Sequence, residues 1–217
     1  MHIKHTLVSL ALLGLVTGMQ GTTAWGGNAP NGASARQAQQ QASVEALTAP
    51  EETDILFMRE EEKLARDVYR FLYDLWLQPV FYNISESEQR HMDSMALLVE
   101  TYGLTDPVQD DSVGAFTNPD LASLYISLTT RGQASLLEAL QVGAFIEEVD
   151  MRDIQLAIDN AAHADIIQTY ENLLRGSRNH LRAFVRTIES LGVVYEAQVL
   201  PQSEVDAIVD SPVERSR

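Results

Sequence analysis

Two side chains of metal-binding type stand three residues apart in the middle of the chain. Glu88 and His91 are followed by apolar residues at Met92, Met95 and Leu98. Positions i and i+3 of a helix share a face. Because this face continues into an apolar stripe, we expect the carboxylate and the imidazole to point into a helical core. Inward Glu-x-x-His pairs are the units from which dinuclear carboxylate metal sites in helical bundles are built.

Glu88 has a second interpretation, as part of a helix cap. Ser85-x-x-Glu88 is a capping box, in which the glutamate would satisfy a backbone N–H in the first turn of a helix. Asn83-x-x-Glu86 is an equally good, earlier cap, and it predicts a helix from about Asn83 to Gly103 that carries Glu88 inside it. The inward polar groups on the other predicted helices make the capping interpretation the weaker one.

The helix before this one offers two neighbouring carboxylates. The capping box Thr48-Ala49-Pro50-Glu51, with a proline in the first turn, predicts its start, and Pro79 predicts that it stops just before. Glu61 and Glu62 lie in its middle, and the helical phase of the apolar residues slightly prefers Glu61 as the inward one.

A third long helix is predicted over about residues 133–160. Its apolar stripe contains a single charged member, Glu147, so the phase selects Glu147 over the adjacent Glu148. Asp150, three residues further along, is an additional candidate ligand on the same face.

The fourth long helix is predicted over about residues 164–192, with His180 in the middle of its apolar stripe. Gly176 interrupts it at a cost of about 1 kcal/mol relative to alanine. Small residues at Gly176 and Ser177 would let a neighbouring group or a ligand approach the helix closely.

The segment between the second and third long helices determines the fold. Residues 104–132 are rich in turn residues, and Asn118-Pro119 caps a short helix that runs to about Leu128. Two short-linked helical hairpins joined by one long crossover form the ferritin-like arrangement of a four-helix bundle. The predicted fold is therefore all-α: a ferritin-like four-helix bundle with one long crossover containing a short extra helix.

Composition restricts the chemistry and the partners. The 217 residues include no cysteine, which excludes disulfides, thiol catalysis and iron–sulfur clusters, so any metal must sit on oxygen and nitrogen ligands. The net charge of −16 and the pI near 4.5 argue against nucleic acid or an anionic membrane surface as a partner. The length and the 45% apolar content suit one ordinary folded domain.

Four segments follow from the pattern along the chain. Residues 1–24 have a basic start, a short apolar run and a small-residue cleavage site, and predict a signal peptide cut near Ala24, with an uncleaved anchor as the alternative. Residues 25–47 predict a flexible linker rich in Gly, Ala, Ser, Asn and Gln. Residues 48–200 hold the bundle, and residues 201–217 form a polar C-terminal tail. We expect the mature protein in the periplasm or secreted.

Four sequence blocks, one on each long helix, carry a family resemblance. They are residues 60–69 (EEEKLARDVY), 87–93 (SEQRHMD), 143–148 (GAFIEE) and 175–182 (RGSRNHLR). In this order they resemble the DUF2202 family, a bacterial and archaeal group of ferritin-like proteins whose biochemical function is uncharacterised. The resemblance covers about residues 50–200 and implies a ferritin-like bundle.

A more remote likeness concerns the first helix. Glu62-x-x-Ala65-Arg66-x-x-Tyr69 is similar to the first-helix metal motif of rubrerythrins, which implies Glu62 as the ligand, with Glu61 as its substitute. For this reason Glu62 is preferred although helical phase slightly favours its neighbour.

The fourth helix departs from that pattern. Rubrerythrins and ferritins with a complete di-iron site carry a second Glu-x-x-His there, whereas this chain has Ser177-x-x-His180. One bridging carboxylate is missing, so we expect a less symmetric centre. The departure affects oxygen activation more than it affects metal binding.

Together these observations predict a dinuclear metal centre. The expected metal ligands are Glu62, Glu88, His91, Glu147 and His180, with Glu61, Glu148 and Asp150 held as substitutes or extra ligands. Carboxylate oxygens with a few imidazoles suit iron, manganese or zinc, and we expect dinuclear iron. The corresponding function is an exported di-iron oxidoreductase of peroxide, oxygen or ferroxidase type, with turnover left open. Expected partners are metal ions, further copies in a homo-oligomer and an external electron donor, with no nucleic acid and no membrane for the mature chain.

Two alternatives stay open on the sequence. One is a metal-binding or storage module that does not turn over. The other is a structural bundle whose polar core is held by salt bridges without a metal, for which four arginines are available as partners: Arg90, Arg152, Arg178 and Arg182. The tyrosines on the apolar stripes, among them Tyr69 and Tyr170, are predicted to be plain core residues.

Overall fold

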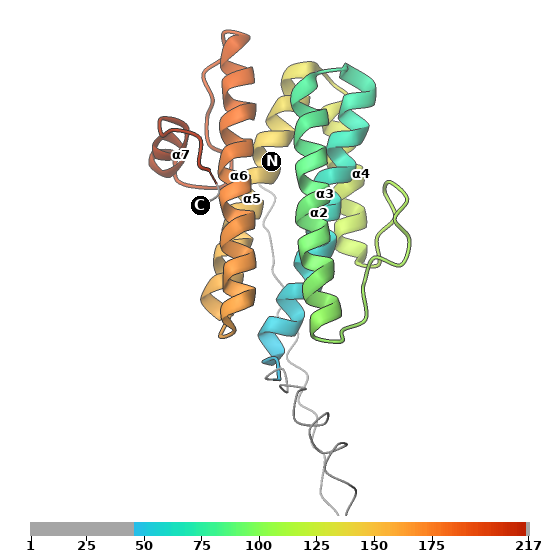
Figure 1. The fold of residues 1–217 in the computed structure, drawn as a ribbon. Coiled ribbons are helices and arrows are strands. Elements are labelled where there is room, and N and C mark those ends of the chain that lie inside the picture. Colours follow the sequence, from blue (N-terminus) through green and yellow to red (C-terminus); the bar gives the residue numbers. More distant parts are fainter. Residues whose placement is uncertain (1–45, 216–217) are drawn as a thin grey trace, which may run out of the picture. The chain divides into compact units, whose positions relative to one another are not determined.

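The computed structural model describes residues 46–215, which form helices and no strands (Figure 1). The long helices are α2 (Ala49–Trp76), α3 (Pro79–Thr101), α5 (Leu136–Asn160) and α6 (Ala164–Ser190), and the shorter ones are α4 (Pro119–Gly132) and α7 (Gln202–Val209). The all-α prediction is confirmed. The predicted signal peptide and nearly all of the predicted linker lie outside the described residues.

The four long helices form two hairpins. Only Leu77 and Gln78 separate α2 from α3, and Leu77 takes the left-handed conformation that ends α2. Residues 161–163 connect α5 to α6. The long connection from α3 to α5 contains α4, and Figure 1 shows the two hairpins standing side by side as a bundle. The predicted bundle with one long crossover and a short extra helix is thus confirmed.

Two helix starts show how local sequence acts. The predicted capping box at the start of α2 is present: Thr48 Oγ1 accepts a hydrogen bond from Glu51 N at 3.3 Å, and Glu51 accepts one from Thr48 N at 2.9 Å. The predicted start of α3 near Asn83 is wrong. The helix begins at Pro79, whose fixed φ and missing N–H suit a first-turn position.

This earlier start settles the role of Glu88. With α3 beginning at Pro79, Glu88 lies in the third turn of the helix, where no orphan backbone N–H needs a cap. The Ser85 hydroxyl instead donates to the Tyr82 carbonyl at 2.9 Å, inside the helix. The capping interpretation of Glu88 is therefore wrong.

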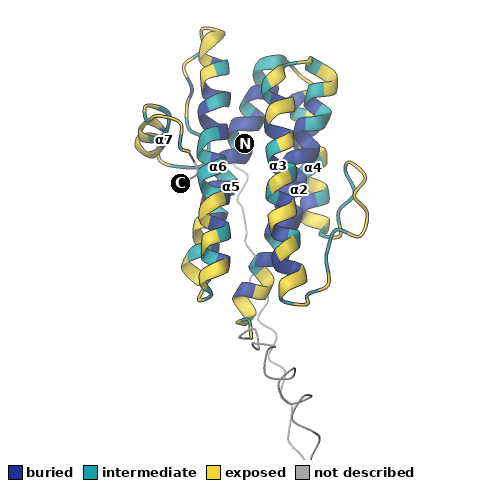
Figure 2. Ribbon diagram, viewed as in Figure 1, coloured by how far each residue is buried: buried dark blue, intermediate teal, exposed yellow. Residues whose placement is uncertain are grey.

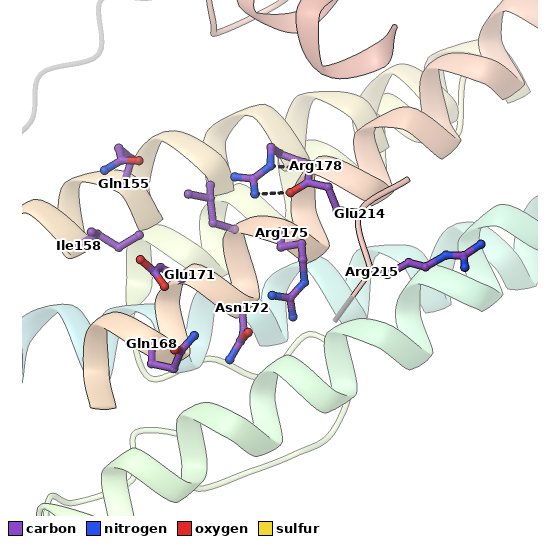
Figure 3. Close-up of a pocket in the computed structure, with 10 residues that line it drawn as sticks. Gln155, Ile158, Gln168, Glu171, Asn172, Arg175, Arg178, Glu214 and Arg215 are labelled. Carbon is purple, nitrogen blue, oxygen red and sulfur yellow. Dashed lines mark hydrogen bonds and ion pairs between the residues drawn. The ribbon is translucent and has the colours of Figure 1, made fainter. Parts of the chain in front are cut away.

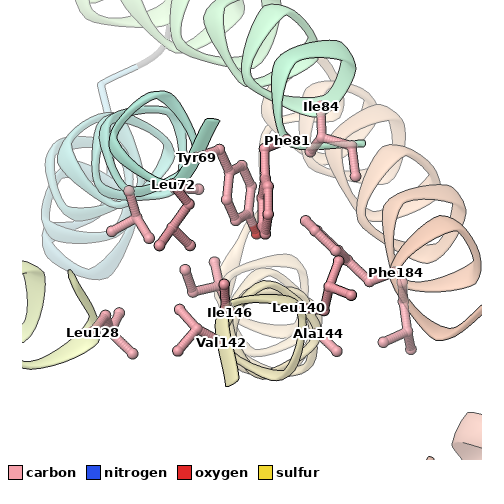
Figure 4. Packing of buried hydrophobic residues seen from close by; sticks show 14 of the residues in the cluster. Tyr69, Leu72, Phe81, Ile84, Leu128, Leu140, Val142, Ala144, Ile146 and Phe184 are labelled. Atoms are coloured by element: carbon pink, nitrogen blue, oxygen red, sulfur yellow. The ribbon is translucent and has the colours of Figure 1, made fainter. Parts of the chain in front are cut away.

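The apolar core consists of two clusters stacked along the bundle. One contains Tyr69, Phe81, Leu140 and Phe184, seen together in Figure 4. The other contains residues such as Met58, Met95, Ile154 and Tyr170. Figure 2 shows the buried residues facing the interior of the bundle. On α2, α3 and α6, the stretch between the contributions to the two clusters carries the polar residues singled out from the sequence, whereas on α5 Glu147 and Asp150 precede Met151 of the first cluster.

The segment after α6 is more ordered than a polar tail suggests. Gln202–Val209 form α7, in which Val205 is buried. Beyond it, Glu214 accepts a hydrogen bond from Arg178 Nη2 of α6 at 2.6 Å. Residues after the bundle therefore fold back on α6. Within the described chain, none of the helices has the length and apolar character needed to cross a membrane.

Candidate metal centre

The layer between the two apolar clusters gathers the predicted ligands. The structure brings together the side chains of Glu62 from α2, Glu88 and His91 from α3, Glu147 from α5 and His180 from α6. The three carboxylates are at most 1% exposed. Burial of this kind is costly for a carboxylate unless a cation or a set of hydrogen bonds compensates it.

The five side chains form two triads that share one carboxylate. In the first, His91 Nδ1 lies 2.7 Å from Glu88 Oε2 and 3.2 Å from Glu62 Oε2. In the second, His180 Nδ1 lies 2.8 Å from Glu88 Oε1 and 3.4 Å from Glu147 Oε2. The centroids of the two imidazole rings are 5.4 Å apart. Glu88 thus presents one oxygen to each triad, as a carboxylate that bridges two metal ions does.

Several of these atoms lack a hydrogen-bond partner. Within the described chain, this holds for both carboxylate oxygens of Glu88, for Oε1 of Glu62 and for Nδ1 of His180, all of which are buried. The contacts between Glu88 and the imidazoles have the distance of an ion pair without the alignment of a hydrogen bond. Because buried polar atoms are normally hydrogen-bonded, converging unpaired oxygens and nitrogens fit a bound cation.

The arginines do not neutralise this layer. Among residues 46–215, none of the four candidate arginines pairs with a carboxylate of the two triads. Arg152 pairs with the residue next to it, and Arg178 and Arg182 pair with Glu214. Arg90 forms no ion pair within the same range. The arginine salt bridges expected for a metal-free polar core are therefore not formed by these four residues in the described chain.

Without a metal, the histidines act as the counter-charges. Burial would lower the pKa of both imidazoles, but the carboxylates outweigh it. Glu88 and Glu147 raise the pKa of His180 to about 9. Glu88 and Glu62 raise the pKa of His91 well above its usual range. Both rings therefore carry a proton at neutral pH when no metal is bound.

The carboxylates differ in their proton affinity. Burial favours the neutral form of Glu88, yet the charges of His180 and His91 hold the pKa of its carboxyl below the usual range. Burial dominates at Glu62 and raises its pKa to about 7. Burial also raises the pKa of Glu147, against the opposing effect of His180. Of the three, Glu88 is thus the carboxylate whose surroundings favour the ionised form.

The serine in place of the second bridging glutamate has a partner of its own. The Ser177 hydroxyl donates a hydrogen bond to Asp150 of α5, and both side chains are buried. Burial, followed by the charge of nearby Glu62, raises the pKa of Asp150 well above its usual range. The carboxylate absent from α6 therefore has a counterpart on α5, three residues after Glu147.

Two other candidates lie outside the triads. Glu61 is buried, and burial together with the charge of Asp153 on α5 raises its pKa well above its usual range. Glu148 faces the segment after α6: it accepts hydrogen bonds from the Tyr195 hydroxyl at 2.5 Å and from the backbone N–H groups of residues 198–200. Glu148 thus fastens that segment to α5.

One contributor was missed on the sequence. Tyr69, predicted as plain core, donates its hydroxyl hydrogen bond to Glu147 Oε1 at 2.6 Å. Hydrogen bonds of this kind orient metal ligands. The sequence signal that could have identified Tyr69 is its position: it follows Glu62 by seven residues, which puts both side chains on one face of α2, two turns apart.

Comparison with known proteins places the chain in a family. A family model described as an uncharacterized protein domain, DUF2202, matches residues 51–212. The chain is 46% identical over 169 residues to the uncharacterized protein MJ0754 of Methanocaldococcus jannaschii, and the match covers 78% of this chain and 91% of that protein.

A solved structure agrees with this match. It is the crystal structure of hypothetical protein MJ0754 from Methanococcus jannaschii, which superimposes with a TM-score of 0.77 at 43% identity and covers 81% of this chain and all of that one. The resemblance inferred from the four sequence blocks is confirmed, and the chain belongs to the DUF2202 family.

Proposed function

We propose that the protein binds two metal ions, with iron as the preferred metal, in a carboxylate-bridged centre. The observation that carries the proposal is the position of Glu88, whose two oxygens face two different histidines at 2.7 and 2.8 Å without hydrogen-bond alignment. Glu62 with His91 would complete one metal site, and Glu147 with His180 the other.

Charge and ligand type support this proposal. Three buried carboxylates and two neutral imidazoles would carry three negative charges, and two divalent ions would offset them, leaving a net charge of about +1. Oxygen and nitrogen donors without any thiolate suit iron, manganese or zinc.

Bound iron would supply redox chemistry towards oxygen or peroxide. The chain contributes the setting: apolar clusters lie on both sides of the layer, and Tyr69 holds Glu147 by its hydroxyl. His91 and His180 would each release a proton if metal ions bind, because a ligating imidazole must be neutral. We further propose an external electron donor, a homo-oligomer and an extracytoplasmic location for the mature chain, the last from residues 1–24.

Metal analysis tests the proposal directly. The protein is purified without chelator, loaded with Fe(II) and analysed for metal, and anomalous scattering then locates the ions. We expect about two metal ions per chain and about one or fewer in His91→Ala and in His180→Ala. His163→Ala is the matched control, since His163 Nδ1 also lies 2.8 Å from a buried carboxylate, that of Glu51.

The result that would overturn the proposal is a low metal content. Fewer than about 0.2 metal ions per loaded chain would exclude the site. Equal loss in the His163 variant would show that metal binding does not depend on the triads.

A storage module without turnover is the second candidate. The observation in its favour is Ser177, which leaves α6 without the bridging carboxylate of a symmetric di-iron site. Addition of peroxide to the iron-loaded protein separates the two. Repeated cycles with an added reductant support an oxidoreductase, whereas one oxidation without cycling supports storage.

A further inference from the structure

A pocket of about 270 Å³ lies between α3 and α6 and reaches the candidate centre. His91, one of the expected ligands, forms part of its lining, together with Gly176 and Arg175 of α6 and Arg90 of α3. The side chain of His91 is 12% exposed, whereas the carboxylates of its triad are at most 2% exposed. Among the described residues, this is the edge of the first triad that a small molecule could approach.

The pocket adjoins a larger surface pocket of about 920 Å³. The two share Asn172, Arg175 and Glu214. Figure 3 shows Asn172 and Arg175 directed from α6 towards α3, and Arg178 paired with Glu214. A molecule in the larger pocket therefore meets Arg175 on its way to His91.

Positive charge gathers here in a strongly acidic protein. Arg90 and Arg175 line the smaller pocket from opposite helices, and within the described chain neither guanidinium forms an ion pair or a hydrogen bond. The net charge of the whole chain is −16. Two unpaired arginines facing one pocket therefore give this pocket a positive charge in a protein that is negative overall. An unpaired guanidinium presents a fork of N–H donors that matches an oxyanion.

The protein's own C-terminal segment shows that this region accepts a carboxylate. Glu214 takes hydrogen bonds from Arg178 Nε at 2.8 Å and Nη2 at 2.6 Å, and Arg182 Nη2 lies 2.9 Å away. Two arginines neutralise this single carboxylate, so it does not cancel the charge of the other two. Glu171 lines only the larger pocket and leaves the smaller one positive.

We propose that the pocket between α3 and α6 binds a small oxyanion, of carboxylate or phosphate type, between Arg90 and Arg175 at the edge of His91. A volume of about 270 Å³ suits a small ion. Anion binding in the pocket needs only the arginines. A role of the pocket as an entrance or substrate site of the metal centre rests on the proposed function.

Anion titration of the full chain, metal-free and metal-loaded, tests the proposal. Inorganic phosphate and acetate are the two probes. Calorimetry and changes in NMR chemical shift measure the binding of each. We expect saturable binding of at least one probe in the millimolar range, with shifts confined to α3 and α6 around the pocket. The preferred probe distinguishes a tetrahedral oxyanion from a carboxylate.

Arginine variants assign the site. Arg175→Gln and Arg90→Gln should weaken binding about tenfold or more. Arg186→Gln, an exposed arginine of the same helix α6 outside the pocket, should bind like the unaltered chain. Thermal melting checks folding, and the shift map of the unaltered protein locates the site even if a variant unfolds.

Two results would overturn the proposal: no saturable binding of either probe, or equal weakening in the Arg186 variant. The metal proposal fails separately, through metal content. If the metal-free chain binds the anion but takes up no iron, the anion-site proposal is supported and the metal-centre proposal is refuted. If the chain binds iron but neither anion, the metal-centre proposal is supported and the anion-site proposal is refuted.

Discussion

A Cβ atom on Gly176 of α6 would lie 2.5 Å from both Cε1 and Nε2 of the His91 imidazole of α3. Real Cβ contacts are not this short, so only glycine lets the His91 ring take its position beside α6. Glycine inside a helix costs about 1 kcal/mol relative to alanine. The residue that weakens α6 locally therefore makes room for an expected ligand.

Gly176→Ala should displace His91 and impair the first triad. We expect iron content to fall from about two to about one ion per chain, because the second triad, with His180, keeps its geometry. Metal analysis measures the loss. Gly132→Ala is the control, since its Cβ would meet Leu72 at 2.5 Å in the apolar core and not the centre. An unchanged metal content in the Gly176 variant would show that His91 is not a ligand.

Removing the tyrosine hydroxyl should weaken metal binding without abolishing it. Tyr69→Phe deletes the hydrogen bond that orients Glu147, and loss of such a contact typically costs about tenfold to a hundredfold in metal affinity. Competition with a chelator measures the change. Tyr170→Phe is a matched control, because the buried Tyr170 hydroxyl has no hydrogen-bond partner among residues 46–215. Equal affinities in the two variants would contradict the role given to Tyr69.

The shared carboxylate should matter more than either of its neighbours. Glu88→Gln is expected to lose both metal ions, because Glu88 belongs to both triads, whereas Glu62→Gln should keep about one. Glu61→Gln should keep about two, since Glu61 lies outside both groups. Elemental analysis of the three variants decides between Glu61 and Glu62. Metal loss in the Glu61 variant alone would reverse that assignment.

Metal affinity should rise with pH. Below the His180 pKa of about 9, the metal must displace a proton from that imidazole, and below the Glu62 pKa of about 7 a further one. The apparent affinity should increase about tenfold per pH unit for each proton released. Chelator competition at several pH values measures this slope. A flat profile between pH 6 and 9 would exclude protonated imidazoles at the site.

The metal-free protein should show the opposite trend in stability. The pKa of His180 is raised from 6.5 to about 9 on folding, so its contribution is fully present below pH 6.5 and is lost as the pH rises through 9. Glu62, raised from 4.5 to about 7, acts in the same direction at lower pH. Urea midpoints of metal-free protein should therefore fall from pH 6.5 to 9. A rising midpoint over that interval would contradict the assignment.

Glu148 should act on stability and not on metal. Glu148→Gln replaces one of the two carboxylate oxygens, which accept from the backbone N–H groups of residues 198–200, by an NH₂ donor. This change should lower the free energy of unfolding by about 2–3 kcal/mol. Urea unfolding measures this, with the exposed Glu189→Gln expected within about 0.5 kcal/mol of the unaltered chain. Unchanged metal content would separate Glu148 from its neighbour Glu147.

Much of the fold could be predicted because it rests on local rules. The helical period of the apolar residues and the Thr48 capping box identified α2, and the turn residues around Asn118 identified the crossover and α4. The start of α3 was missed because two polar caps in the sequence competed with Pro79, and packing against α2 carries the helix back to that proline. Periodicity finds a helix well and its first residue poorly.

The sequence by itself determined the all-α class, the two hairpins with a crossover, and an inward polar group or pair on each long helix, since these follow from spacing within a helix. Only the tertiary structure decided that Glu88 is shared between two histidines, that Ser177 holds Asp150, and that Gly176 borders His91. It also brought Glu214 to Arg178, far along the chain. These relations depend on how the helices pack against one another, which the period of a single helix does not contain.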